Sequence, residues 1–129
     1  METPHPANAR VLAFAAHGPM LDRAVCAITH GGMGATQKAL ARGVPVCAVP
    51  FGRDQFEVAR RVELAAAGTR LPARRLSPER LRAAVQEAIR CQQGARRVAE
   101  SYRKAGGAVA AADALEELIG SPLHGPGGP

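Results

Sequence analysis

The stretch that decides the fold runs from residue 24 to residue 50 and reads AVCAITHGGMGATQKALARGVPVCAVP. It holds two short apolar runs, Ala24–Thr29 and Val46–Val49. Runs of this kind indicate strands that are buried on both faces, as in parallel sheets. Between them, Ala35–Arg42 predicts a helix that ends at Gly43. Strand, helix and strand in this order predict two parallel strands joined by a right-handed crossover.

The same alternation continues on both sides of this stretch. Upstream, Val11–Phe14 predicts another strand, and Gly18-Pro19 breaks the pattern before a helical turn at Met20–Arg23. Downstream, Gln55–Ala66 predicts a helix with apolar residues on one face, and Thr69–Leu71 predicts a short strand. Three more helices are predicted: one capped by Ser77, one at about 95–105 and one at about 108–119. The predicted fold class is α/β, a partial Rossmann-like parallel sheet flanked by helices.

Length and composition limit the organisation of the chain. Its 129 residues, 47% of them hydrophobic, leave room for one domain with a real core. We expect a loose leader at 1–8, a domain at 9–120 and a disordered tail at 121–129, which is rich in Gly and Pro. No apolar run is long enough to span a membrane, and the first ten residues do not read as a secretory signal. We therefore expect a cytoplasmic protein.

The net charge of +6 comes from one segment, because residues 70–104 hold ten Arg or Lys and three Glu. Tyr102 is the only aromatic residue in this segment, so the aromatic interleaving that stacks bases is missing, and a solvated helix face is favoured over nucleic-acid binding. A basic surface that attracts an anionic ligand or a membrane face is the second interpretation. Cys26, Cys47 and Cys91 show no CxxC spacing and are expected to be free buried thiols, with a disulfide or metal site as the alternative.

Unusual residues gather where the predicted strands end. Phe14 and His17 follow the first strand, His30–Gly34 follows the second, and Gly52–Gln55 follows the third. Ligands of open parallel sheets bind beyond the carboxyl ends of the strands. These three loops are therefore expected to meet around one ligand.

The loop HGGMG at His30–Gly34 suits a phosphate. Its glycines let the backbone approach a ligand, and the following helix offers unpaired N–H groups. His30 can donate a hydrogen bond, and Thr36 adds a hydroxyl in the first turn. The loop matches neither the dinucleotide fingerprint nor a P-loop, so a glycine-rich turn without a ligand stays open.

The loop at Gly52–Gln55 suits hydroxyl groups. Asp54 and Gln55 place a carboxylate and an amide side by side, and such a pair can hold several sugar hydroxyls. The alternative is structural, because Asp54 is also a good N-cap for the helix that follows.

The segment His30–Gly68, HGGMGATQKALARGVPVCAVPFGRDQFEVARRVELAAAG, resembles the donor-binding half of nucleotide-sugar glycosyltransferases. These are UDP-glycosyltransferase-like enzymes of the two-domain GT-B fold, and the bacterial branch that glycosylates macrolides and other natural products is most similar. The resemblance extends over roughly Ala9–Ile119. It rests on HGG-x-G, ALA-x-GVP, VPF and DQ at these spacings.

The resemblance implies roles for individual residues. His30 would contact the diphosphate, and Asp54 and Gln55 would hold the sugar. Phe14 matches a position that stacks on the base, and His17 lies beside it. The remaining diphosphate contacts would be Gly32, Met33 and Gly34, through their backbone N–H groups, and Thr36.

Three positions depart from the family pattern. Lys38 stands where many relatives carry a Glu that holds the ribose hydroxyls, and a lysine cannot accept hydrogen bonds. Lys38 could face a phosphate instead. Ala35 lacks a hydroxyl that is frequent at its position, and Val58 replaces a frequent Asn.

The implied reaction is transfer of a sugar from a UDP- or dTDP-sugar to a hydroxyl of a small lipophilic acceptor. The donor is a substrate, and we expect neither a cofactor nor a metal. In this family the general base and the acceptor pocket lie in an N-terminal domain, which has no counterpart here. We therefore assign no catalytic residue, and His5 in the leader is not given that role. The base, the sugar and the acceptor are not specified by the sequence.

Two readings follow from this resemblance. The chain is either the donor-binding part of a truncated enzyme or a stand-alone, non-catalytic subunit of a split glycosyltransferase. A basic nucleic-acid-binding protein is the least favoured alternative.

Overall fold

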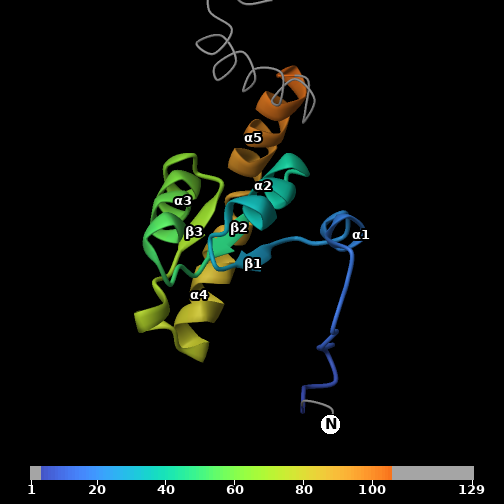
Figure 1. Ribbon diagram of the computed structural model, residues 1–129, viewed down its shortest axis with the longest axis vertical. Coiled ribbons are helices and arrows are strands. Elements are labelled where there is room, and N and C mark those ends of the chain that lie inside the picture. The colour runs from blue at the N-terminus through green and yellow to red at the C-terminus, as the bar shows by residue number, and fades with distance from the viewer. Residues whose placement is uncertain (1–3, 106–129) are drawn as a thin grey trace, which may run out of the picture.

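The structure is a computed structural model that describes residues 4–105. The helix predicted at about 108–119 and the tail predicted at 121–129 lie outside the described residues. Three parallel strands form one sheet in the order β1-β2-β3 (Figure 1). They are β1 at Ala27–Thr29, β2 at Val46–Ala48 and β3 at Gly68–Arg70.

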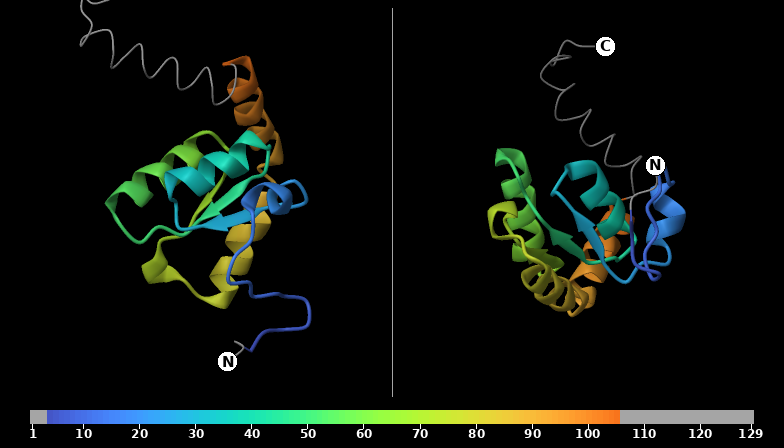
Figure 2. Two further views of the ribbon diagram at one scale, coloured as in Figure 1. Left: turned by 45° about the vertical axis from the view of Figure 1, so that its right-hand side comes forward. Right: turned by 90° about the horizontal axis from the view of Figure 1, so that it is seen from below.

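Helices connect and cover these strands. Figure 2 shows α2 and α3 on one face of the sheet and α4 on the other. The parallel sheet and the alternation of strands and helices predicted from the sequence are confirmed. The helices are α1 at His17–Leu21, α2 at Met33–Ala41, α3 at Arg53–Leu64, the 3-10 turn η1 at Ala73–Arg75, α4 at Pro78–Ile89 and α5 at Gln92–Lys104.

The alternating side chains of β2 divide the core into two layers. Val46 and Ala48 point to one face, where small and aliphatic residues of α2, α3 and α5 bury them. Cys47 and Val49 point to the other face and pack against α4. All three residues of β2 are buried, which confirms its prediction as a strand covered on both faces.

The strand predicted at Val11–Phe14 is wrong. These residues form no strand and are exposed, with Phe14 87% accessible. They belong to an extended arm of residues 4–16 that runs away from the sheet (Figure 1). A strand needs a neighbour for its backbone hydrogen bonds, and no described strand lies beside this segment.

The strand predicted at Ala24–Thr29 is shorter than expected and is not buried on both faces. Only Ala27–Thr29 pairs with β2, and Ile28 is 54% exposed. The physical reason is that β1 lies at the edge of the described sheet. Among the described residues it has a neighbouring strand on one side only, so part of its apolar surface stays exposed.

Several helix starts differ from the prediction. Helix α2 begins at Met33 rather than Ala35, and α5 begins at Gln92 rather than near 95. Helix α1 includes Gly18-Pro19, because a proline in the first turn needs no N–H partner. The cap predicted at Ser77 is confirmed, since its Oγ accepts a hydrogen bond from the Arg80 N–H at 3.1 Å.

The basic segment forms exposed helix surfaces. At the end of α4, the C-cap residue Arg90 pairs with Glu87 at 3.3 Å, and within α5, Arg103 pairs with Glu100 at 2.6 Å. All four side chains are well exposed. This agrees with the solvated helix face favoured from the sequence.

The three cysteines are free thiols, as predicted, although only Cys47 is fully buried. Burial and, to a smaller extent, the neighbouring Cys47 raise the pKa of the Cys26 thiol from 9.0 to about 11. Burial also raises the pKa of Cys47. The folded chain disfavours the charged thiolate. Folding is therefore opposed once the pH is high enough for the thiol of the unfolded chain to lose its proton.

We therefore expect the stability of the fold to decrease as the pH rises from about 9 to about 11. In this window the unfolded chain releases the Cys26 proton before the folded chain does. Urea unfolding at pH 8, 9, 10 and 11 measures the trend. The Cys26→Ala variant should lose less stability over this range than the parent chain, and equal losses would contradict the assignment.

Candidate functional site

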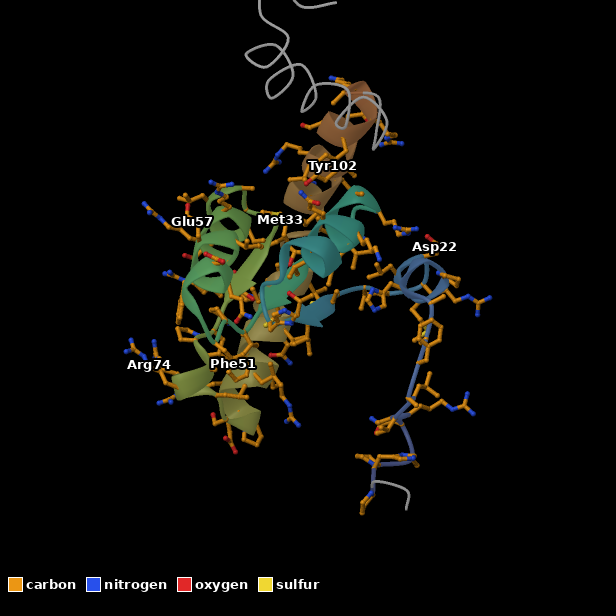
Figure 3. All side chains as sticks on the ribbon, viewed as in Figure 1. Asp22, Met33, Phe51, Glu57, Arg74 and Tyr102 are labelled. Carbon is orange, nitrogen blue, oxygen red and sulfur yellow. The ribbon has the colours of Figure 1, made fainter. Side chains whose placement is uncertain are left out.

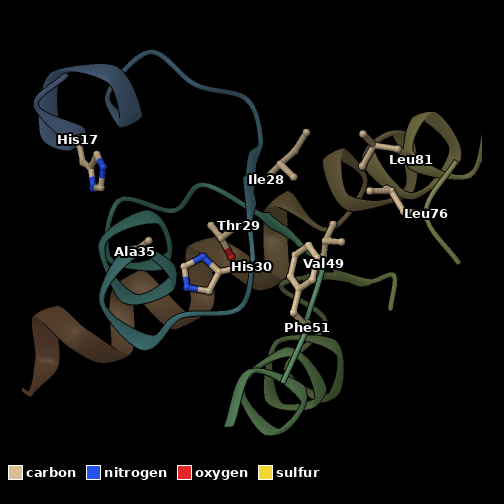
Figure 4. A pocket seen from close by; sticks show the side chains of 9 residues that line it. All are labelled: His17, Ile28, Thr29, His30, Ala35, Val49, Phe51, Leu76 and Leu81. Atoms are coloured by element: carbon tan, nitrogen blue, oxygen red, sulfur yellow. The ribbon is translucent and has the colours of Figure 1, made fainter. Parts of the chain in front are cut away.

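A cleft of about 520 Å³ lies at the carboxyl ends of the strands. Figure 4 shows the His30 imidazole within it, with Phe51 and Val49 to one side and His17 farther away on α1. The lining mixes two histidines with mostly apolar side chains, which suits a ligand with one flat apolar part and one polar part. The lining residues are His17, Ile28, Thr29, His30, Ala35, Val49, Phe51, Leu76 and Leu81.

The loop between β1 and α2 is held in a fixed conformation. Gly31 has a φ of +87°, which favours glycine, and its N–H donates to Thr29 Oγ1 at 3.0 Å. The same Thr29 oxygen lies 3.3 Å from Thr36 Oγ1. The two hydroxyls therefore tie the end of β1 to the first turn of α2.

The His30 ring lies over Gly32, at the start of α2. A Cβ placed on Gly32 would come within 2.5 Å of His30 Nε2, so only glycine leaves room for the ring in this position. Gly32 is the N-cap of α2, and no side chain caps that end. The first-turn N–H groups therefore keep their hydrogen-bonding capacity beside His30, where an anion is favoured.

The loop between β2 and α3 is organised by Gln55. Its Oε1 accepts from the N–H groups of Phe51 and Gly52, at 2.8 and 3.1 Å. The N-cap of α3 is Gly52, so the alternative in which Asp54 is the N-cap is wrong. Asp54 stands in the first turn with its side chain exposed. With its oxygen engaged, Gln55 can offer a ligand only its N–H₂ group, whereas an ionised Asp54 can only accept.

The two loops touch each other through their backbones. A Cβ on Gly31 would lie 2.8 Å from the carbonyl oxygen of Gln55. The end of β1 and the start of α3 are thus packed closely, and His30 and Gln55 come from adjoining loops. This convergence was expected from the parallel topology.

The predicted site residues fall into three groups: those at the cleft, those in the first turn of α3, and those that lie elsewhere. Asp54 and Gln55 form the second group and are not among the residues that line the cleft. His17 and His30 both line the cleft, and Gly32, Met33 and Gly34 form the start of α2 beside it. Figure 3 shows Met33 on α2 and Phe51 after β2.

Phe14 and Thr36 lie elsewhere. Phe14 is in the exposed arm and does not line the cleft. Thr36 is only 2% exposed and its hydroxyl meets Thr29. Contacts of these two residues with a ligand stay predictions.

Sequence reasoning missed three apolar residues of the cleft. Phe51 is not among the predicted site residues, although its position directly after a buried strand could have marked it. Leu76 lies just before α4 and Leu81 lies in its first turn, and both line the cleft. Their position depends on how α4 packs under the sheet, which local sequence does not specify.

Within residues 4–105, no group of three or more His, Cys, Asp or Glu is placed to hold a metal ion. Within the same residues, none of the helices has the length and apolar character that crossing a membrane would need.

An open parallel sheet with an uncapped, glycine-rich helix start and a histidine at its carboxyl edge is an arrangement that favours an anionic ligand. The family model described as "Erythromycin biosynthesis protein CIII-like, C-terminal domain" matches residues 3–117. The chain therefore belongs to this family of glycosyltransferase C-terminal domains.

Characterised relatives and solved structures agree with this assignment. The chain is 36% identical over 119 residues to 4'-demethylrebeccamycin synthase of Lentzea aerocolonigenes, covering 90% of this chain and 28% of the relative. It is 32% identical to demethyllactenocin mycarosyltransferase of Streptomyces fradiae, covering 90% of this chain and 26% of the relative. The crystal structure of the calicheamicin glycosyltransferase CalG4 superposes with a TM-score of 0.76 at 30% identity, covering 91% of this chain and 31% of that one.

The structure of the glycosyltransferase VinC in complex with dTDP superposes with a TM-score of 0.77 at 26% identity, covering 93% of this chain and 30% of that one. The chain thus spans less than a third of the length of these relatives. The fold class predicted from the sequence, a C-terminal half of a GT-B glycosyltransferase, is confirmed.

Proposed function

We propose that this chain is the donor-binding part of a glycosyltransferase and binds a nucleoside diphosphate sugar, a UDP- or dTDP-sugar. The sugar would be transferred to a hydroxyl of a small lipophilic acceptor held by a part of the enzyme that these residues do not supply. The donor is the substrate, and the proposal includes no further cofactor. A stand-alone donor-binding subunit of a split enzyme remains the second form of the same proposal.

The observation that carries the proposal is the position of His30 over the uncapped start of α2. The ring nitrogen and the free N–H groups of Met33 and Gly34 can donate to the same anion. Donors fixed at this point would stabilise the charge that builds on a diphosphate leaving group. The dTDP bound to the similar glycosyltransferase VinC supports a nucleoside diphosphate as the ligand.

The adjoining loop supports a sugar beside the diphosphate. Asp54 offers an acceptor and the Gln55 amide offers a donor, at the start of α3. A sugar hydroxyl is both donor and acceptor, so one residue of each kind can fix two neighbouring hydroxyls. The apolar side chains of Val49 and Phe51 line the cleft, where they can pack against the flat base or the sugar ring.

Titration of the full chain with UDP, dTDP, UDP-glucose and uridine tests the proposal. We expect the diphosphates to bind more tightly than the nucleoside, with NMR shifts centred on Gly31–Gly34. If uridine and UDP bound equally, or if none bound, the phosphate assignment would be rejected.

Replacing Asp54 by Asn separates sugar contact from support of the helix. We expect the affinity for UDP-glucose to fall about fivefold, because a neutral acceptor hydrogen-bonds about 1 kcal/mol less strongly than a charged one. Affinity for UDP should not fall. Stability should decrease by no more than about 1 kcal/mol, the usual effect of one charge in a first helical turn.

Glu57→Gln is the matched control for this change. Glu57 lies one turn later on the same helix, is exposed and pairs with Arg61 at 3.4 Å. It should leave both affinities unchanged while removing the same charge from the same helix. Equal losses of UDP-glucose affinity in the two variants would show that Asp54 acts only through its charge.

A further inference from the structure

Four arginines lie beside the cleft, in the segment that follows β3. Residues 74–82 read RRLSPERLR and hold Arg74, Arg75, Arg80 and Arg82 against a single Glu. All four arginines are exposed. These four residues are called the arginine rim below. Because surface charges act on ions over a distance, the position of the rim relative to the cleft decides what it can do.

The fold ties the arginine rim to the cleft. The Ala73 N–H donates to the Pro50 carbonyl at 3.0 Å, which joins η1 to the loop after β2. Leu76 and Leu81, which are interspersed with the arginines along the chain, line the cleft itself. Figure 4 shows these two leucines on the opposite side of the cleft from His17. The rim therefore borders the candidate site on the side away from α1.

The charges of the arginine rim are not neutralised by ion pairs. Within residues 4–105, no carboxylate lies within 4.0 Å of a guanidinium nitrogen of the rim. Arg80 Nη1 donates to the Arg75 carbonyl at 3.2 Å, a contact that fixes the side chain of Arg80 and leaves its charge available. The arginines that do have carboxylate partners in this part of the chain are Arg42, Arg61, Arg70, Arg90 and Arg103.

Acidic residues do not offset the rim at this edge of the sheet. The segments after β2 and β3, taken as residues 49–55 and 71–82, contain five arginines and two carboxylates. The loop after β1, His30–Gly34, contains no carboxylate, and none of the residues that line the cleft is acidic. The mouth of the cleft therefore carries a net positive charge, which attracts anions.

We propose that the arginine rim attracts the diphosphate of the donor to the cleft before contact and so raises its association rate constant. This rests on the proposed function, in which the diphosphate binds at His30 and the start of α2. The rim residues do not line the cleft, so they act through their electric field and not by hydrogen bonds to the bound nucleotide. Fields of this kind raise association rate constants by about 10- to 1,000-fold at low ionic strength.

The effect of the rim should follow the charge of the ligand. A terminal phosphate loses its second proton near pH 6, so UDP carries about three negative charges at pH 7, against about two for UDP-glucose and none for uridine. The field therefore favours UDP over UDP-glucose. As a consequence, free UDP should compete with the donor more strongly as the ionic strength falls.

The test removes three charges of the rim in the variant Arg74→Gln/Arg75→Gln/Arg82→Gln and keeps Arg80, which contacts η1. NMR line shapes of the Gly31–Gly34 amides during titration with UDP give both rate constants. At about 10 mM ionic strength, where the screening length is about 30 Å, the association rate constant should fall about tenfold. At about 1 M, where the screening length is about 3 Å, it should differ from the parent chain by less than about twofold. The dissociation rate constant should change by less than about twofold at both ionic strengths.

The matched control, Arg96→Gln/Arg97→Gln/Lys104→Gln, removes the same number of charges from α5. These positions are exposed and none of them lines the cleft. Figure 3 shows Tyr102 of α5 at the opposite end of the molecule from Phe51. Each triple variant lowers the net charge from +6 by three, so only the location of the lost charge differs. The control should bind UDP at a rate within about twofold of the parent chain.

Two further measurements make the test specific. The loss in the rim variant should be smaller for UDP-glucose than for UDP, and uridine should bind all variants alike. If circular dichroism shows that the triple variant is unfolded, Arg74→Glu and Arg74→Gln replace it. The Glu variant reverses the charge and should therefore slow the association of UDP more than the Gln variant does.

The proposal is overturned if the rim variant and the control associate with UDP equally fast at about 10 mM ionic strength. It is also overturned if the loss persists at about 1 M or appears in the dissociation rate constant, because either result would indicate direct contact. Either outcome leaves the proposed function standing, provided that the parent chain binds UDP more tightly than uridine. If the parent chain does not, the proposed function and this inference are rejected together.

Discussion

Purified residues 1–129 should transfer no sugar. Turnover with UDP-glucose or dTDP-glucose and a panel of small hydroxylated acceptors should stay below about 10⁻³ s⁻¹, against about 10 s⁻¹ for a typical enzyme. The candidate site residues come from one edge of one sheet, and the proposed function assigns all of them to the donor. General-base help contributes about 10²- to 10⁴-fold, and orientation of the acceptor contributes more.

Labelled-sugar transfer measures this directly. The NDP-glycosyltransferase YjiC of Bacillus licheniformis, a relative 36% identical over 103 residues, serves as the positive control under the same conditions. Turnover by the 129-residue chain at a rate near that of the control would show that it holds a base and an acceptor site of its own.

Replacing His30 by Ala should weaken the binding of UDP by about 10- to 150-fold. This range corresponds to about 1.5–3 kcal/mol, the usual contribution of a hydrogen bond to a charged group. Binding of uridine should change much less, because it carries no phosphate. Isothermal titration calorimetry of both ligands measures the difference.

His5→Ala is the matched control, since His5 lies in the exposed arm and its Nδ1 meets only the neighbouring Pro6 carbonyl. A second variant, Gly32→Ala, should reproduce part of the loss, because its Cβ would displace the His30 ring. Gly34→Ala places its Cβ in open space and should not. Equal losses for UDP and uridine in His30→Ala would remove His30 from the phosphate site.

Most of the fold could be predicted because its signals are local. The apolar run at Val46–Val49 and the cap at Ser77 specify a buried strand and a helix start without knowledge of distant residues. Val11–Phe14 and Ala24–Thr29 carry a similar apolar signal but lack buried surroundings. The composition of a segment indicates that it can form a strand, whereas the burial of that strand depends on which other segments pack against it.

The part of the candidate site that depends on the backbone could be predicted from the sequence. The glycines of His30–Gly34 indicate a helix start close to a ligand, and the parallel topology places them beside Gln55. The contributions of Leu76 and Leu81 could not be predicted, because they depend on the packing of α4. The buried position of Thr36 also escaped prediction, since a hydroxyl in a first turn can face either the ligand or the sheet.

The hydrogen bonds of Gln55 restrict how donor preference can be altered. Its oxygen accepts hydrogen bonds from the two N–H groups that precede α3, so the residue that would select a sugar also stabilises the start of a helix of the core. Random mutagenesis for a new sugar should rarely yield folded variants at this position. Changes at Asp54, whose side chain is exposed and holds no part of the fold, should be tolerated far more often. In an engineering campaign, libraries are therefore better directed to Asp54 than to its neighbour.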